Sequence, residues 1–223
     1  MAGSWLVEQA VGTAAHFHAR SLPDPATRSV EVLEVDRGAL VLGSTQAEAD
    51  ADRGALRAAG IDLVRRRSGG GAVLLVPGQS LWVDVVVPRS DPLWDDDVGR
   101  AAHWLGRAWA AALATLGVDA TVHTEGLVAT RWSPLVCFAG LGPGEVTSAG
   151  RKLVGIASRR SRAGARFQCV VVRRWDPAAL LGLLAMDDDD RVAAHAEVAG
   201  AAAGVEAPFP EVLDALLACL PGR

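Results

Sequence analysis

The chain has 223 residues, of which half are hydrophobic and 22% are charged, and its formal net charge is −4. This composition excludes a disordered chain, a collagen-like repeat and a disulfide scaffold, and the acidic balance argues against general nucleic-acid binding. Three cysteines without an export signal predict a cytoplasmic protein. The longest apolar stretch, Ala101–Val118, carries His103 and Arg107, so no membrane span is predicted.

Six segments carry helical spacing or helix start and stop signals. The best of them, Asp95–Leu116, begins with three aspartates and precedes Gly117. Its Trp104 and Trp109 recur at helical spacing and are expected to pack in the core. The predicted helices are Ala10–Ser21, Gln46–Ala59, Asp95–Leu116, Pro177–Ala185, Arg191–Ala199 and Pro210–Leu220. The aspartate run Asp187–Asp190 is expected to be an exposed loop between two helices rather than a metal site.

Short apolar or alternating runs predict the strands, and Pro77-Gly78 predicts a hairpin between two of them. The predicted strands are Val30–Val35, Ala39–Leu42, Asp62–Val64, Ala72–Val76, Leu81–Val87, Val136–Phe138, Gly144–Thr147, Lys152–Ala157 and Arg166–Val172. Early strands, a central helix and later strands indicate an α+β fold with a mixed, mainly antiparallel sheet flanked by helices.

A glycine cluster stands inside a region that otherwise reads as strand, in the sequence Arg65-Arg66-Arg67-Ser68-Gly69-Gly70-Gly71-Ala72-Val73. Three consecutive glycines cost conformational entropy and are useful where a ligand lies against bare backbone. The adjacent arginines offer cationic forks for a carboxylate or a phosphate. The alternative is a glycine-rich hairpin with solvated arginines.

The second motif, Gly150-Arg151-Lys152-Leu153-Val154-Gly155-Ile156-Ala157, presents the only lysine of a chain that has 21 arginines. A compact ammonium suits a developing negative charge on an acyl or phosphoryl oxygen. A lysine left there by chance is the alternative.

Together the two motifs resemble the family of lipoate–protein ligases, biotin–protein ligases and octanoyltransferases, and the resemblance runs from about Val30 to Val172. It implies a catalytic domain like that of class II synthetases and biotin ligases, over residues 1–176. Residues 177–223 are expected to form a C-terminal helical extension packed on the same domain.

The resemblance implies transfer of a lipoyl or octanoyl group to a lysine of a carrier protein. In the ligases of this family, ATP with Mg²⁺ first converts the acid to an acyl-adenylate. Lys152 would then contact the carboxyl and phosphate oxygens. The expected substrate-binding residues are Arg66, Ser68, Gly69, Gly70, Gly71, Ala72, Val73, Gly155, Ile156 and Ala157. The implied partner is the lipoyl carrier domain of a 2-oxoacid dehydrogenase complex or a similar acceptor.

Two departures from the ligase pattern leave a transferase function as an alternative. Leu74-Leu75-Val76 replaces the aromatic-His-Asp stretch of many ligases, and Pro77-Gly78-Gln79 resembles the octanoyltransferases. Cys137 lies in a segment resembling the loop of the nucleophilic cysteine in one transferase class, which needs no cofactor and uses an acyl carrier protein as donor. A buried, inert Cys137 and a non-catalytic acyl- or adenylate-binding module are the remaining alternatives.

Three further expectations concern side chains outside these motifs. Cys169 and Cys219 are expected to pack as hydrophobes, and no metal site is predicted. A basic segment after Lys152 is either solvated or a docking face for an acidic carrier domain. Its members are Arg159, Arg160, Arg162, Arg166, Arg173 and Arg174. Glu145 receives no role.

Overall fold

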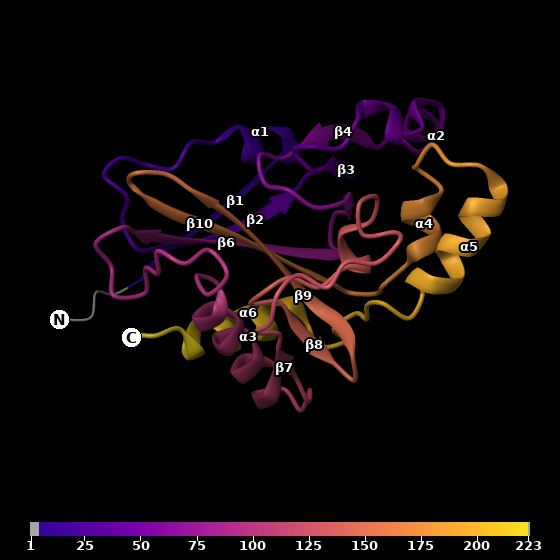
Figure 1. The fold of residues 1–223 in the computed structure, drawn as a ribbon. Helices are drawn as coiled ribbons and strands as arrows, with labels where there is room; N and C mark the ends of the chain where they lie inside the picture. Colours follow the sequence, from indigo (N-terminus) through magenta and orange to yellow (C-terminus); the bar gives the residue numbers. More distant parts are fainter. Residues whose placement is uncertain (1–4, 223) are drawn as a thin grey trace.

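The computed structural model describes residues 5–222. The first four residues of the predicted catalytic domain (1–176) and the last residue of the predicted C-terminal extension (177–223) lie outside the described residues. Two sheets form the framework (Figure 1). The larger sheet has the order β1 (Leu6–Gly12), β2 (Ser29–Val35), β6 (Ser80–Pro88), β10 (Gly164–Val172), β9 (Arg151–Arg160), β8 (Val146–Ser148) and β7 (Thr121–Val122). The smaller sheet has the order β4 (Asp62–Arg65), β3 (Ala39–Leu42) and β5 (Val73–Leu75).

Within each sheet one pair of strands is parallel, β1 with β2 and β3 with β4, and the other pairs are antiparallel. The helices are α1 (Ala14–Ala19), α2 (Arg53–Ala59), α3 (His103–Thr115), α4 (Pro177–Leu181), α5 (Asp188–Val198) and α6 (Phe209–Cys219), with short 3₁₀ turns at Glu48–Asp50 and Cys137–Ala139. The α+β class and the mixed, mainly antiparallel sheet are therefore confirmed.

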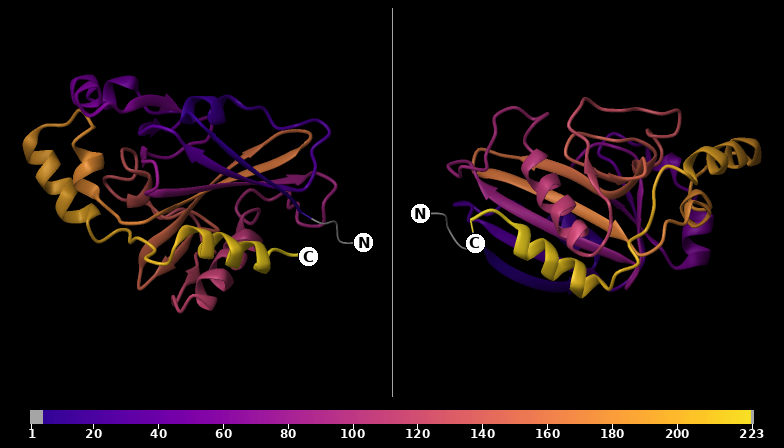
Figure 2. Two further views of the ribbon diagram at one scale, coloured as in Figure 1. Left: turned by 180° about the vertical axis from the view of Figure 1, so that it is seen from behind. Right: turned by 90° about the horizontal axis from the view of Figure 1, so that it is seen from below.

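One face of the large sheet is covered by α3 and α6 (Figure 2, right). Trp104 and Trp109 of α3 lie in this core, as does the buried thiol of Cys169, and Cys219 packs against its edge. The core predictions for these residues are confirmed. No helix among residues 5–222 is long and apolar enough to cross a membrane.

The other face of the large sheet meets the small sheet and α1. The side chains of Phe17, Leu33 and Trp82 pack there with residues of β3, β4 and β5. A third cluster joins α2, α4 and α5 to the segment around Trp132 and Val136. The space between the two sheets is therefore walled by elements that are far apart in the sequence.

Several predicted elements were wrong in extent or pairing. Residues 10–12 belong to β1, and only Ala14–Ala19 form a helix. Residues 46–59 break into a 3₁₀ turn and α2, and α4 ends at Leu181 rather than Ala185. Val136–Phe138 is no strand, because a 3₁₀ turn begins at Cys137.

The hairpin around Pro77-Gly78 was also wrong, although the turn exists and Gly78 has a φ of +68°. The strand before it, β5, pairs with β3 in the small sheet, and the strand after it, β6, pairs with β2 and β10 in the large sheet. The turn therefore carries the chain from one sheet to the other.

The two aspartate runs are placed differently from their predictions. The helix predicted from Asp95 begins only at His103, because the Asp95 carboxylate accepts hydrogen bonds from Arg100 and the amide of Asp97 in a preceding turn. The second run is the start of α5 rather than a loop. Asp187 is its N-cap and accepts from the amide of Asp190 at 2.7 Å, which satisfies a free N–H of the first turn.

Candidate active site

A cavity of about 680 Å³ lies between the two sheets. Its walls carry most of the site residues predicted from the sequence, namely Lys152, Cys137, Arg66, Gly69, Gly70, Gly71, Val73, Gly155, Ile156 and Ala157. Ser68 and Ala72 are buried and are not among the lining residues. The two motifs, which are about eighty residues apart in the sequence, therefore share one cavity.

The Arg66 guanidinium lines the cavity and is hydrogen-bonded to the glycine loop. It is 5% exposed, and its Nη2 donates to the carbonyl oxygens of Gly69 at 2.8 Å and Gly71 at 2.7 Å. Its Nε and Nη1 donate to the carbonyls of Gly69 and Val41. Arg65 likewise donates to the carbonyls of Gly43 and Gln46. The predicted cationic forks for a ligand are therefore used on backbone at these two positions.

Two glycines of the loop are required by their surroundings. A Cβ on Gly71 would lie 2.5 Å from the amide nitrogen of Val136, and Gly70 has a φ of +92°. A Cβ on Gly69 would meet nothing within 4 Å. No hydrogen bond among residues 5–222 uses the amide N–H of Gly69 or Gly70, so these groups remain available to a ligand.

Lys152 lies at the start of β9 with its charge buried. Its amide donates to Ala201, and its carbonyl accepts from Ala203, so both sides of its backbone are fixed. The side chain is 3% exposed, and Nζ lies 2.7 Å from Oε2 of Glu145 and 3.0 Å from the carbonyl oxygen of Cys137. The ammonium also lies 5.2 Å from the ring centre of Phe138.

Glu145 also lines the cavity, beside Lys152, and was missed by the sequence prediction. Its Oε2 also accepts from the amide of Gly142 at 2.6 Å, and its Oε1 accepts from the amide of Ile156 at 3.1 Å. The carboxylate thereby holds the Lys152 ammonium against the cavity wall. A glutamate seven positions before the only lysine, across a glycine turn, was the available signal.

Cys137 is half-buried and lines the same cavity. Its sulfur would lie 3.7 Å from a Cβ placed on Gly70, so the thiol faces the glycine loop. Lys152 contacts the carbonyl oxygen of Cys137, and no hydrogen bond among the described residues involves the sulfur.

The other end of the cavity carries polar side chains that the sequence reading also missed. His18 of α1 packs on Trp82, with ring centres 4.6 Å apart, and its Nδ1 lies 3.5 Å from Nε2 of Gln168. Burial, followed by the charges of Arg66 and Arg166, lowers the pKa of His18 from 6.5 to about 4. The imidazole at this end of the cavity is therefore neutral at pH 7.

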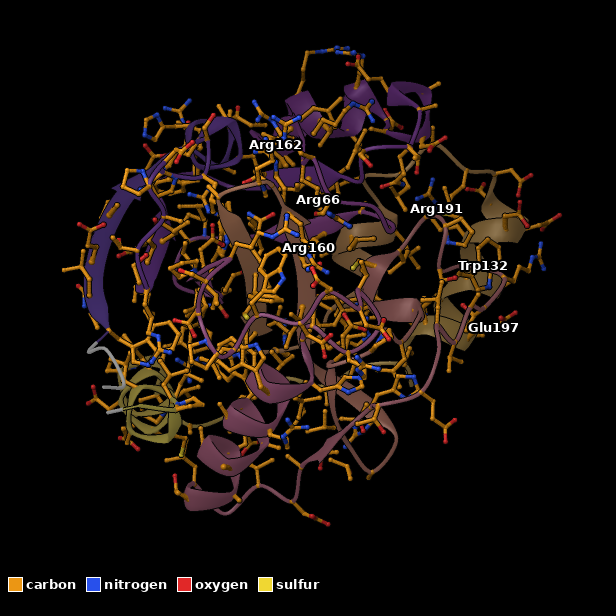
Figure 3. All side chains as sticks on the ribbon, turned by 60° about the vertical axis from the view of Figure 1, so that its left-hand side comes forward. Arg66, Trp132, Arg160, Arg162, Arg191 and Glu197 are labelled. Carbon is orange, nitrogen blue, oxygen red and sulfur yellow. The ribbon has the colours of Figure 1, made fainter. Side chains whose placement is uncertain are left out.

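The basic segment does not form one free face. Arg160 donates to the carbonyls of Asp95 and Asp96, and Arg173 donates to those of Glu206 and Ala207. Arg166 is 4% exposed. Figure 3 shows Arg160, Arg162 and Arg66 apart from Arg191 and Glu197 of α5 and from Trp132, which packs near α5. Neither predicted reading, a solvated segment or a docking face, describes all six arginines.

No group of three or more histidines, cysteines, aspartates or glutamates that could hold a metal ion occurs among residues 5–222. The cavity thus presents a buried ammonium–carboxylate pair, a half-buried thiol and open glycine backbone at one end. A neutral imidazole and an amide stand at the other.

Solved structures of lipoate ligases share this fold. A bipartite lipoate protein ligase of Thermoplasma acidophilum, studied with its E2 lipoyl domain, aligns over 97% of this chain and 82% of its own, with a TM-score of 0.75 and 18% identity. A Thermoplasma acidophilum protein with bound lipoic acid and lipoate-protein ligase A bound with ATP each align over 98% of this chain and 84% of their own, with a TM-score of 0.69 and 21% identity.

The fold is thus shared with the lipoate ligase structures. Residues 17–212 match the lipoyl protein ligase A/B catalytic domain. The chain therefore belongs to the lipoyl protein ligase A/B catalytic-domain family. No curated protein matches the sequence.

Proposed function

We propose that this protein is an acyl–protein ligase that joins a lipoyl or octanoyl group to a lysine of a carrier domain through an acyl-adenylate. The single observation that carries this function is the buried Lys152 ammonium, held by Glu145 at the cavity end where the glycine backbone is bare. Such a fixed cation stabilises negative charge that develops on an oxygen beside it.

The first step joins the acid to ATP. A carboxylate oxygen attacks the α-phosphorus, pyrophosphate leaves, and the acyl-adenylate remains. Lys152 neutralises charge on the carboxyl and phosphate oxygens, while Glu145 keeps Nζ in position. The free amides of Gly69 and Gly70 allow a phosphate to lie close to the backbone. Mg²⁺ would arrive with the nucleotide.

The second step transfers the acyl group. A deprotonated lysine amine of the acceptor attacks the acyl carbon, forms the amide bond and expels AMP. The acceptor would be a lipoyl carrier domain, the kind of partner named for the Thermoplasma ligase. The chain's own residues bind the acid, orient its carboxyl group and exclude water from the mixed anhydride.

A second function is favoured by one observation, the half-buried thiol of Cys137 in the same cavity wall. In this alternative the thiolate takes an acyl group from a carrier-protein thioester and passes it to the acceptor lysine, without ATP. Lys152 contacts the backbone rather than the sulfur of Cys137, which favours the ligase.

The deciding experiment supplies a lipoyl carrier domain with lipoate and ATP in one reaction, and with octanoyl carrier protein but no ATP in another. We expect modification only in the first, lost in Lys152→Ala and retained in Cys137→Ser. Modification only in the second, lost in Cys137→Ser, would establish the transferase instead. Acid binding without modification in either reaction would indicate a binding module.

A further inference from the structure

Trp175 lies behind the cavity wall that carries Lys152, and neither proposed reaction uses it. It follows β10, is half-buried and is not among the residues that line the cavity. Its indole ring stacks on the ring of Phe138, with ring centres 5.3 Å apart and planes inclined by 21°. Phe138 is 2% exposed and does line the cavity. The indole therefore supports the wall from outside the space that an acid would occupy.

The ring of Phe138 connects Trp175 to the side chain of Lys152. The ammonium lies over this ring, 5.2 Å from its centre, which is within the range of a cation–π contact. A Cβ on Gly155 would lie 3.4 Å from two carbons of the same ring, so the ring packs directly on the backbone of β9. Loss of the indole would free the Phe138 ring to move, and the contact with the ammonium would change with it.

The indole N–H of Trp175 is connected to the backbone of Lys152 by a second route. Nε1 donates to the carbonyl oxygen of Val198, the last residue of α5, at 2.9 Å. The same oxygen accepts from the amide of Ala201 at 3.1 Å, and the carbonyl of Ala201 accepts from the amide of Lys152 at 2.9 Å. The amide of Ala203 donates to the carbonyl of Lys152, also at 2.9 Å. Trp175 thus holds the turn after α5 that fixes the Lys152 backbone.

We propose that Trp175 is a positioning residue for Lys152. Its ring holds the ammonium in place through Phe138, and its indole N–H holds the backbone through the turn after α5. The effect on catalysis rests on the proposed function, whereas the positioning itself does not. A fixed cation must lie beside the oxygen on which charge develops, and a small misplacement lowers the rate steeply. Because Trp175 does not line the cavity, its loss should lower kcat without raising the KM for the acid.

The test uses the fact that Lys152 is the only lysine of the chain. Protein that incorporates lysine enriched in ¹³C and ¹⁵N therefore gives one backbone amide signal and one set of side-chain signals. The wild-type ε-CH₂ protons should lie upfield of those of free lysine, because the Phe138 ring current acts on them. Trp175→Leu removes both the ring and the N–H, so it should shift the side-chain and the amide signals. Trp175→Phe keeps a ring without the N–H, so it should shift the amide signal alone.

Trp94→Phe is the matched control. Trp94 is also half-buried and donates its indole N–H, to Oδ1 of Asp96 at 3.0 Å, but it does not line the cavity. Its replacement should leave all Lys152 signals in their wild-type positions. In the acyl-transfer assay, Trp175→Leu should lower kcat at least about tenfold, with the KM for the acid within about twofold of wild type. Trp94→Phe should leave both constants unchanged.

Wild-type ε-CH₂ protons at the free-lysine position would overturn the ring contact, and this result needs no variant to fold. Unchanged Lys152 signals in Trp175→Leu, or a raised KM with an unchanged kcat, would also overturn the inference. Lys152 signals that respond as expected in a protein that forms no acyl-adenylate would leave the positioning and remove the ligase. Adenylate formation together with unresponsive Lys152 signals would leave the proposed function and remove the positioning role.

Discussion

Lys152 and Glu145 act as one unit, because each buried charge is compensated by the other. Their nitrogen and oxygen are 2.7 Å apart, and both side chains are less than a tenth exposed. Removing one partner of a buried pair leaves the other charge without compensation, whereas removing both leaves no charge to desolvate.

Glu145→Gln is therefore expected to lower the free energy of unfolding by about 3 kcal/mol. The double variant Glu145→Gln/Lys152→Met should regain most of that loss and remain inactive, because it retains no ammonium. Urea unfolding at pH 7, together with adenylate formation, measures both effects. Losses that simply add in the double variant would show that the two charges do not compensate each other.

Two buried groups near the polar end of the cavity, Asp84 and His18, change the pH dependence of the free energy of unfolding in opposite directions. Burial raises the pKa of Asp84 to about 7 from 3.8, so the folded state keeps a proton that the unfolded chain has lost, and stability falls as pH rises through that range. The pKa of His18 is lowered to about 4 from 6.5, so there the unfolded chain holds the extra proton and stability rises with pH.

His18→Phe removes only the rising contribution. Its free energy of unfolding should therefore decline more steeply than that of the wild type between about pH 4.5 and 6.5. Asp84→Asn should tilt the profile in the opposite direction. Urea titrations at three pH values across this range provide the comparison, and parallel profiles for His18→Phe and wild type would contradict the assignment.

The sequence singled out Lys152 and the glycines because rarity and local pattern marked them. It did not single out His18, whose ring partner is Trp82 and whose hydrogen-bond partner, Gln168, is 150 residues away. Nothing near position 18 shows that α1 faces a cavity. Glu145 was within reach of the reading, but its role depends on the β8–β9 turn that brings it back to Lys152.

At the scale of the element, the glycine loop is held by its neighbours from both sides. A Cβ on Gly43 would lie 1.8 Å from the carbonyl oxygen of Gly70, and Arg66 binds the loop carbonyls from within the protein. The loop's shape is therefore set by backbone contacts with β3 and the segment at Val136.

Gly71→Ala is expected to destabilise the protein by about 1–3 kcal/mol, because its Cβ would press on the fixed backbone of Val136. Gly69→Ala should change stability by less than about 0.5 kcal/mol, since its Cβ enters open space. Thermal unfolding of the two variants tests the difference. A tolerated Gly71→Ala would mean that the Val136 segment can yield.

Helices and strands were predicted correctly where the local sequence pattern determines them. They were predicted wrongly where pairing with a distant strand determines them. The strands β2 and β3 and the helix α6 follow from their apolar spacing. The edge strand β1 has mostly exposed or partly exposed side chains and owes its strand form to parallel pairing with β2. Whether β5 and β6 form a hairpin is likewise fixed by their partners in two different sheets.

At the scale of the whole molecule, the large sheet separates the main hydrophobic core from the cavity. One face packs on α3 and α6 to make the main core, and the other faces the cavity. The two ends of the described chain close over the core side, where Nε1 of Trp5 donates to the carbonyl of Pro221 at 3.0 Å. Stability and ligand binding should therefore respond separately to substitutions on opposite faces.

Leu216→Ala tests this separation. Leu216 of α6 is fully buried on the core side, so its truncation should lower the free energy of unfolding by about 2–5 kcal/mol. Because the cavity wall is on the opposite face, saturating lipoate should add the same increment of stability to variant and wild type. Urea unfolding with and without lipoate measures both quantities. A smaller increment in Leu216→Ala would show that a change in α6 packing alters the cavity across the sheet. Equal increments would show that acid binding depends on the two sheets and not on the packing of α6.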